Sequence, residues 1–160
     1  MVKQFNSITE AIKHLQKQIA NSNVNNSHLK DEVAETMREV IQDNVYAAFT
    51  PEEYKRREDD GGFSDTDNMV FTDVQTSGNT VNLTFENITE GNDSMSGKRL
   101  DGLFENGNGV WDKVVVDDQG RVNTEPREFI EDTVNELNRK KDKLLNATKK
   151  DLKSKGFNVK

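Results

Sequence analysis

The segment VYAAFTPEEYKRREDDGGFSDTDNM, residues 45–69, constrains the fold more than any other part of the chain, and we call it the elbow. Thr50-Pro51 ends one helix there, because the residue before a proline is displaced from the α region, and proline suits the first position of a following short helix. Gly61 and Gly62 then permit backbone angles that other residues resist. The elbow therefore predicts a bend between a long helix and a sheet.

Two amphipathic helices are predicted before this bend, within residues 7–49. Ser7 and Glu10 have the spacing of a capping box, and Ser27 or Asn26 can cap the second helix, which we expect to continue to Phe49. Apolar residues follow each cap at helical spacing. These positions are Ile8, Ile12, Leu15 and Ile19 in the first helix, and Leu29, Val33, Met37, Val40, Ile41 and Val45 in the second.

After the elbow, residues 69–123 change to the alternation that is typical of strands. Ser77-Gly78-Asn79 predicts the turn of one hairpin, and a second hairpin is expected to turn at Asp118-Gln119-Gly120. Residues 89–109 lie between the hairpins and are rich in Gly, Asn, Asp and Ser. They form either a mobile loop or a short helical turn that docks on the core. The expected anchors of this region are Leu100, Leu103, Phe104 and Trp111.

A C-terminal helix is predicted over residues 126–153. Its apolar stripe is interrupted at residues 138–142, so we expect the first part to pack on the sheet and the basic second part to reach outward. Residues 1–160 are then a single α+β domain. It has two N-terminal helices, a small antiparallel sheet of hairpins with long loops, and a C-terminal helix.

The composition and charge indicate a subunit that binds to neighbouring proteins. The net charge is −7, and hydrophobic and charged residues each make up 32% of the chain, which predicts a large exposed surface or stabilisation by neighbouring subunits. Residues 126–160 carry ten Lys or Arg against six Asp or Glu, so this end is basic on an acidic body. A basic helix can dock on an acidic partner or a neighbouring copy, or can be a solvated helix face.

No constellation for catalysis or metal binding is recognised. The chain has no cysteine, which excludes disulfides and thiolate chemistry, and His14 and His28 lack a second ligand at metal spacing. Asp65 begins a segment like a calcium loop, but Val70 and Thr76 replace its glycine and its closing glutamate. We therefore predict no enzyme activity, no cofactor and no metal. No signal peptide or membrane span is recognised either, so we expect synthesis in the host cytoplasm.

The elbow carries a resemblance to a known family. Its spacing VY-x-x-F-x-P-x-x-Y-x-RR, followed by GG-x-x-D-x-x-N, is similar to that of small neck proteins of tailed bacteriophages, the head–tail joining or tail-completion proteins. LFENG at residues 103–107 resembles the aromatic-Glu-x-Gly element of this family, and PREFI at 126–130 resembles its Pro-Arg-Pro-Phe element. Glu128 stands where the family prefers proline, and the Asp-Thr-Gly-x-Leu-Arg element of many members is absent.

The resemblance implies a virion structural protein. Such a subunit would form a homo-oligomeric ring, a hexamer or a dodecamer, that contacts other neck, connector or tail-tube proteins. DNA would pass through the ring without specific binding, since an acidic wall repels phosphate. The alternative from composition is a small acidic cytosolic binding module, such as an inhibitor or a host-takeover factor.

The interface residues expected from this hypothesis lie in the elbow and in the later loop. They are Tyr54, Arg56, Arg57, Leu103 and Phe104. The two arginines have two equally weighted interpretations. They form ion pairs with nearby Glu52, Glu53 or Glu58, or they bridge to a neighbouring copy.

Overall fold

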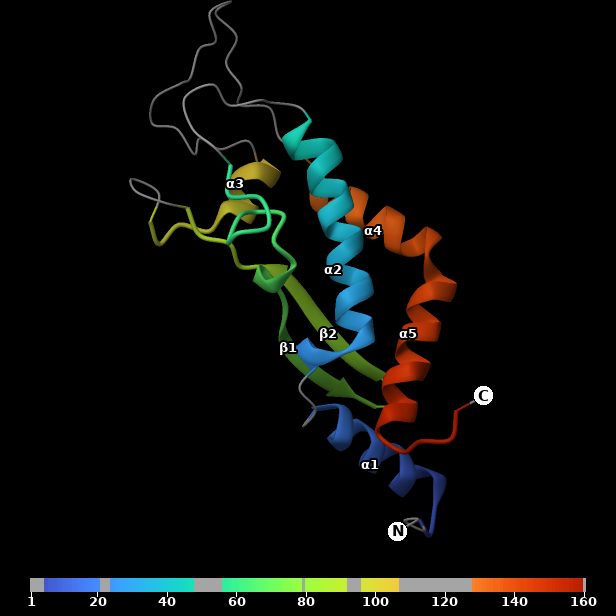
Figure 1. Ribbon diagram of the computed structural model, residues 1–160. Coiled ribbons are helices and arrows are strands. Elements are labelled where there is room, and N and C mark those ends of the chain that lie inside the picture. Colours follow the sequence, from blue (N-terminus) through green and yellow to red (C-terminus); the bar gives the residue numbers. More distant parts are fainter. Residues whose placement is uncertain are drawn as a thin grey trace, which may run out of the picture.

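The computed structural model describes residues 5–20, 24–47, 56–78, 80–91, 96–106 and 128–159. Helix α2 lies between a β hairpin on one side and a pair of C-terminal helices on the other (Figure 1). The predicted α+β class is confirmed. The elements are α1 (Ile8–Ala20), α2 (His28–Val40), β1 (Met69–Ser77), β2 (Thr80–Asn87), α3 (Leu100–Asn106), α4 (Phe129–Arg139) and α5 (Lys141–Ser154), with short 3-10 turns at Val24–Asn26 and Thr66–Asn68.

The predicted caps of the first two helices are present. The Ser7 hydroxyl accepts a hydrogen bond from the backbone N–H of Glu10 at 3.1 Å, and the Glu10 carboxylate accepts one in return from the N–H of Asn6. The Ser27 hydroxyl accepts a hydrogen bond from the N–H of Lys30, also at 3.1 Å, so Ser27 rather than Asn26 is the N-cap of α2. Each cap satisfies a backbone donor that the helix itself leaves without a partner.

The second helix does not continue to Phe49 as an α-helix. At Ile41 it changes into a π-helix that ends at Tyr46, and residues 48–55 lie outside the described part of the chain. Ile41 and Val45 are both buried, so the wider turn keeps this side of the helix against the core. The sequence showed the apolar stripe but not the change of hydrogen-bond pattern.

The first predicted hairpin is confirmed in its position. Ser77 pairs with Thr80 across the turn, and Gly78 there has a φ of +56°, a left-handed conformation that glycine adopts easily. The register shifts between Phe71 and Asp73, which marks a β-bulge. The second predicted hairpin, together with Trp111, lies outside the described residues.

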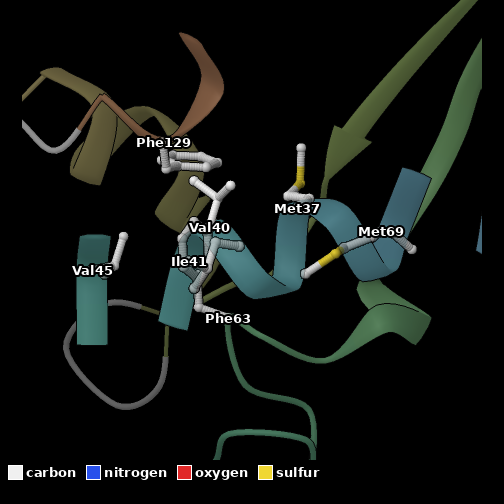
Figure 2. Close-up of a cluster of buried hydrophobic side chains, with 8 residues drawn as sticks. Met37, Val40, Ile41, Val45, Phe63, Met69 and Phe129 are labelled. Atoms are coloured by element: carbon white, nitrogen blue, oxygen red, sulfur yellow. The ribbon is translucent and has the colours of Figure 1, made fainter. Parts of the chain in front are cut away.

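The core is built where α2, the elbow and the start of α4 meet (Figure 2). The ring of Phe63 contacts that of Phe129 edge-on at a centroid distance of 5.2 Å. Phe104 lies 4.8 Å from Phe63 on another side, and Leu100 also packs against the cluster. For the described residues 100–106, the docked helical turn is therefore the interpretation that is observed. The buried cluster consists of Ala34, Met37, Val40, Ile41, Val45, Phe63, Met69 and Phe129.

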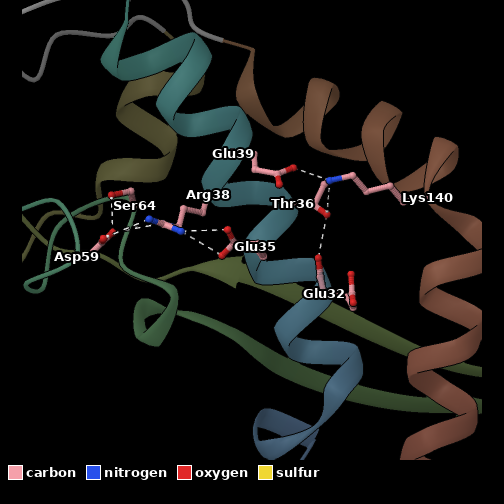
Figure 3. A network of polar contacts seen from close by, with 8 residues as sticks. All are labelled: Glu32, Glu35, Thr36, Arg38, Glu39, Asp59, Ser64 and Lys140. Carbon is pink, nitrogen blue, oxygen red and sulfur yellow. Dashed lines mark hydrogen bonds and ion pairs between the residues drawn. The ribbon is translucent and has the colours of Figure 1, made fainter.

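The C-terminal region differs from the prediction, because it forms two helices instead of one. Lys140 has non-helical dihedral angles and separates α4 from α5, within the predicted interruption of the apolar stripe. Its ammonium group contacts Thr36 Oγ1 at 3.3 Å and Glu39 Oε2 at 2.5 Å, both on α2 (Figure 3). The expectation of an outward basic tail was wrong, since α5 packs on α2 and buries Ala147, and α4 packs chiefly on α2 rather than on the sheet. Among the described helices, none is both long and apolar enough to cross a membrane.

Candidate assembly interface

The described part of the elbow is a tight loop that requires its second glycine. A Cβ atom on Gly62 would lie 2.4 Å from the carbonyl oxygen of Glu58 and 2.5 Å from its nitrogen, distances that real Cβ atoms do not show. Gly61 has a φ of +71°, and Glu58 has the unusual value of +47° for a residue with a side chain. The Asp65 carboxylate holds the loop from the other side by accepting hydrogen bonds from the N–H groups of Gly61 and Asp67.

Both elbow arginines contact their own chain. The guanidinium of Arg56 lies 4.6 Å from the centroid of the Tyr46 ring, a cation–π contact. Arg57 donates a hydrogen bond from Nη2 to the carbonyl oxygen of Glu90 at 2.6 Å. In the described part of the chain, neither arginine forms an ion pair, so the expected pair with Glu58 is not made, and Glu52 and Glu53 lie outside that part. The two arginines therefore fix the elbow loop within its own subunit.

The remaining predicted interface residues are only partly described. Phe104 is half-buried, and its ring packs on Phe63, so it serves as an anchor of α3 on the core. Tyr54 and the side chain of Leu103 lie outside the described residues. The assignment of these residues to an interface between copies remains a prediction.

A polar network joins the elbow to the exposed side of α2 (Figure 3). Arg38 pairs with Glu35 at 3.0 Å and with Asp59 at 3.3 Å, and Asp59 also accepts a hydrogen bond from the Ser64 hydroxyl. The hydrogen bond and charge of Glu35, followed by the charge of Asp59, raise the pKa of Arg38 above its usual value. These pairs are partly exposed, so they orient the loop more than they stabilise it.

A second arginine ties α3 to the end of the hairpin. Arg99 pairs with Asp101 at 2.5 Å and with Glu86 at 3.6 Å, and it donates to the carbonyl oxygen of Asn87. The hydrogen bond that the Arg99 guanidinium donates to the Asp101 carboxylate raises the pKa of Arg99 above its usual value. No group of three or more His, Asp and Glu side chains in the described residues is placed to hold a metal ion. The charged groups here connect elements of the fold.

In the described part of the chain, α1, α4 and α5 each present apolar side chains to solvent, and on α5 this is Leu145, which is 53% exposed. On α1, Ile8 is 81% exposed, and none of the described side chains of that helix is buried. On α4, Ile130 is 43% exposed and Val134 is 50% exposed. Helical spacing reveals such stripes in the sequence, but it does not show which of them the fold covers.

The described residues form a small α+β domain whose charged groups connect its own elements. The family model YomN matches residues 7–154, and the chain belongs to this family. The family is phage-derived, and YomN itself is from a Bacillus prophage. No curated protein and no solved structure matches the chain. Phage origin, which the resemblance to neck proteins implied, is thus confirmed, and the position in the neck remains a prediction.

Proposed function

We propose that the protein is a structural subunit of the phage neck, a tail-completion or head–tail joining protein that forms a ring through which DNA passes. The observation that carries this proposal is the exposure of apolar side chains on α1 and α4, at Ile8, Ile130 and Val134. Single exposed apolar residues are ordinary, but an amphipathic helix of 13 residues with no buried side chain among those described is unstable in isolation. Assembly with neighbours supplies the missing contacts.

The charge of the subunit suits a channel for DNA. A net charge of −7 repeated around a ring produces a negative field that repels phosphate, so DNA slides through without being retained. The partners of this ring are copies of the same chain and the adjacent neck, connector or tail-tube proteins of the virion.

The proposed role is geometric and does not involve catalysis. The ion pairs of Arg38, Arg99 and Lys140 each connect two elements of the fold, which favours a rigid subunit. The elbow sets the angle between α2 and the hairpin. The elbow arginines Arg56 and Arg57 are the proposed contacts with a neighbouring copy, while Phe104 anchors α3 on the core.

Deletion of the gene from the phage that encodes it tests this function directly. We expect the deletion to leave separate heads and tails, and complementation with the wild-type gene to restore joined particles with density for the protein at the collar. Particles that are complete without it would contradict the neck proposal. A soluble one-to-one complex with a host protein would instead support the acidic binding module.

A further inference from the structure

We propose that α1 of one subunit packs its apolar face along the exposed stripe of α4 in the next copy. This contact would join neighbouring subunits of the proposed ring, so it rests on the proposed function. Both faces lie on the same chain, and within its described residues each keeps exposed apolar side chains. The contact is heterologous, since two different surfaces meet, and repetition of such a contact closes a ring when the rotation between subunits permits it.

The apolar face of α1 is only partly covered by the described part of its own chain. Ile8, Ile12 and Leu15 follow one another at spacings of four and three residues, so they share one side of the helix. Ile8 is the most exposed of them, and Ile12 and Leu15 are only half-buried. The rest of the chain holds α1 mainly at the hairpin, where Gln16 donates to the carbonyl oxygen of Gly78 at 2.5 Å. The helix is therefore attached at the hairpin while its first turns extend away from the core.

The stripe on α4 is presented by a helix that is fixed in place. Phe129 is 1% exposed and Thr133 is also buried, so this side of α4 is inserted into the core. Ile130 and Val134 follow one another at a spacing of four residues beside the inserted side. The Glu105 carboxylate accepts a hydrogen bond from the N–H of Ile130 at 3.1 Å and anchors the start of the helix to α3. A stripe of this kind matches the ridge of a second helix.

A second copy is the occupant that the arrangement favours. Figure 1 shows α1 beyond the tip of the hairpin and α4 beside the far end of α2, so the two faces lie at opposite ends of one subunit. Their charges are also opposite in sign. Lys13 and Lys17 outweigh Glu10 on α1, while three carboxylates outweigh Arg139 on α4. The three are Glu131, Asp132 and Glu136.

The small size of the contact between α1 and α4 predicts that a single contact is weak. A helix of 13 residues is about 20 Å long, so its contact with one other helix is smaller than the roughly 800 Å² per partner of a typical stable interface. One contact alone is weak, and the closing of the ring stabilises all of them together. The isolated protein should therefore associate in a concentration-dependent manner.

Disulfide trapping tests the contact, because the chain contains no cysteine. Ile8→Cys and Val134→Cys are made as separate proteins, mixed, and oxidised gently at the highest soluble concentration. We expect a cross-linked dimer in the mixture and none above background in either variant alone, since a disulfide requires Cβ atoms about 4 Å apart. The double variant should form a ladder of linked species, both in solution and in complemented particles.

Lys13→Cys provides the matched control, since its side chain lies about 140° around the helix from Ile8. It should not cross-link to Val134→Cys. Absence of the mixed dimer in solution together with absence of the ladder in particles would overturn the contact, and so would a dimer formed by Ile8→Cys alone. Circular dichroism of each variant verifies that the exposed substitutions leave the fold intact.

The two proposals fail in different ways. Cross-linking by a protein that is absent from the particles would contradict the neck function and leave the α1–α4 contact standing. Density at the collar without cross-linking would contradict the contact and leave the neck function standing. As a second measurement, Ile8→Asp and Val134→Asp should each reduce the oligomer mass measured by light scattering.

Discussion

The carboxylate of Asp151 caps the start of α2, with its Oδ1 atom 2.8 Å from the backbone nitrogen of His28, which lies 123 residues earlier in the sequence. The other carboxylate oxygen accepts the N–H of Leu29 at 2.9 Å. With Ser27 accepting the N–H of Lys30, three successive backbone donors at this helix end are satisfied. A negative charge at a helix N-terminus also interacts favourably with the helix dipole. The contact explains why α5 folds back along α2.

Asp151→Ala should therefore destabilise the whole domain. The substitution leaves two backbone N–H groups without their acceptor, and we expect the free energy of unfolding to fall by about 1 kcal/mol. Urea denaturation followed by circular dichroism measures this. Asp142→Ala removes the same charge from an exposed position in the first turn of the same helix, where only the interaction with the helix dipole is lost, and should cost less, about 0.5 kcal/mol. Equal stability of the two variants would show that the cap contributes nothing.

Gly62→Ala should destabilise the fold strongly, although it adds only one methyl group. The added methyl group meets the backbone of Glu58, which cannot move without opening the elbow loop. We expect a loss of about 2 kcal/mol or more in the free energy of unfolding. Gly102→Ala is the control, because a Cβ there meets nothing within 4 Å and alanine favours the helix. A Gly62→Ala protein as stable as Gly102→Ala would mean that the loop adapts freely.

The local elements of the fold were predictable because local chemistry specifies them. Ser7 and Ser27 cap helices as expected, and Gly78 makes the hairpin turn. The resemblance in the elbow implies phage origin, in agreement with the family to which the chain belongs. These features depend on residues that are close together in the sequence.

Features that depend on distant partners were not predictable. The outward tail was wrong because Asp151 and Lys140 bind backbone and side-chain groups of α2 that lie more than 100 residues away. The exposure of Ile130 was not predicted for a related reason. Helical periodicity shows that a helix has an apolar face, but it does not show whether another element packs on that face. For the candidate interface, the sequence named Arg57 but not its bond to Glu90.

Asn25→Asp should loosen the edge of the hairpin at the bulge. The Asn25 side chain accepts the N–H of Phe71 at 2.7 Å and donates to the carbonyl oxygen of the same residue at 3.2 Å. An aspartate keeps the acceptor but loses the donor and places a negative charge beside a carbonyl oxygen, so we expect a loss of about 1 kcal/mol. Hydrogen exchange at the amide of Phe71 should become faster. Asn26→Asp, which makes the same change at the exposed neighbour, should leave that exchange rate unaltered.

Arg57→Glu should disrupt assembly while leaving the circular dichroism spectrum unchanged. The substitution removes one hydrogen bond to the Glu90 carbonyl, worth about 1 kcal/mol, which a domain with a typical stability of roughly 5–15 kcal/mol tolerates. It also reverses a charge that we propose to face a neighbouring copy. Light scattering of the variant should give a smaller mass than that of the wild type at equal concentration.

Arg57→Gln separates the internal contact of this arginine from the proposed external one. Glutamine retains an N–H donor for the Glu90 carbonyl but carries no charge. If the charge contacts a neighbour, Arg57→Gln also assembles less well than the wild type, whereas Lys153→Glu, a charge reversal at an exposed position of α5, does not. If Arg57→Glu unfolds, or if Arg57→Gln assembles fully, the proposed contact with a neighbour is wrong. The role of Arg57 would then be limited to its hydrogen bond with the Glu90 carbonyl inside its own subunit.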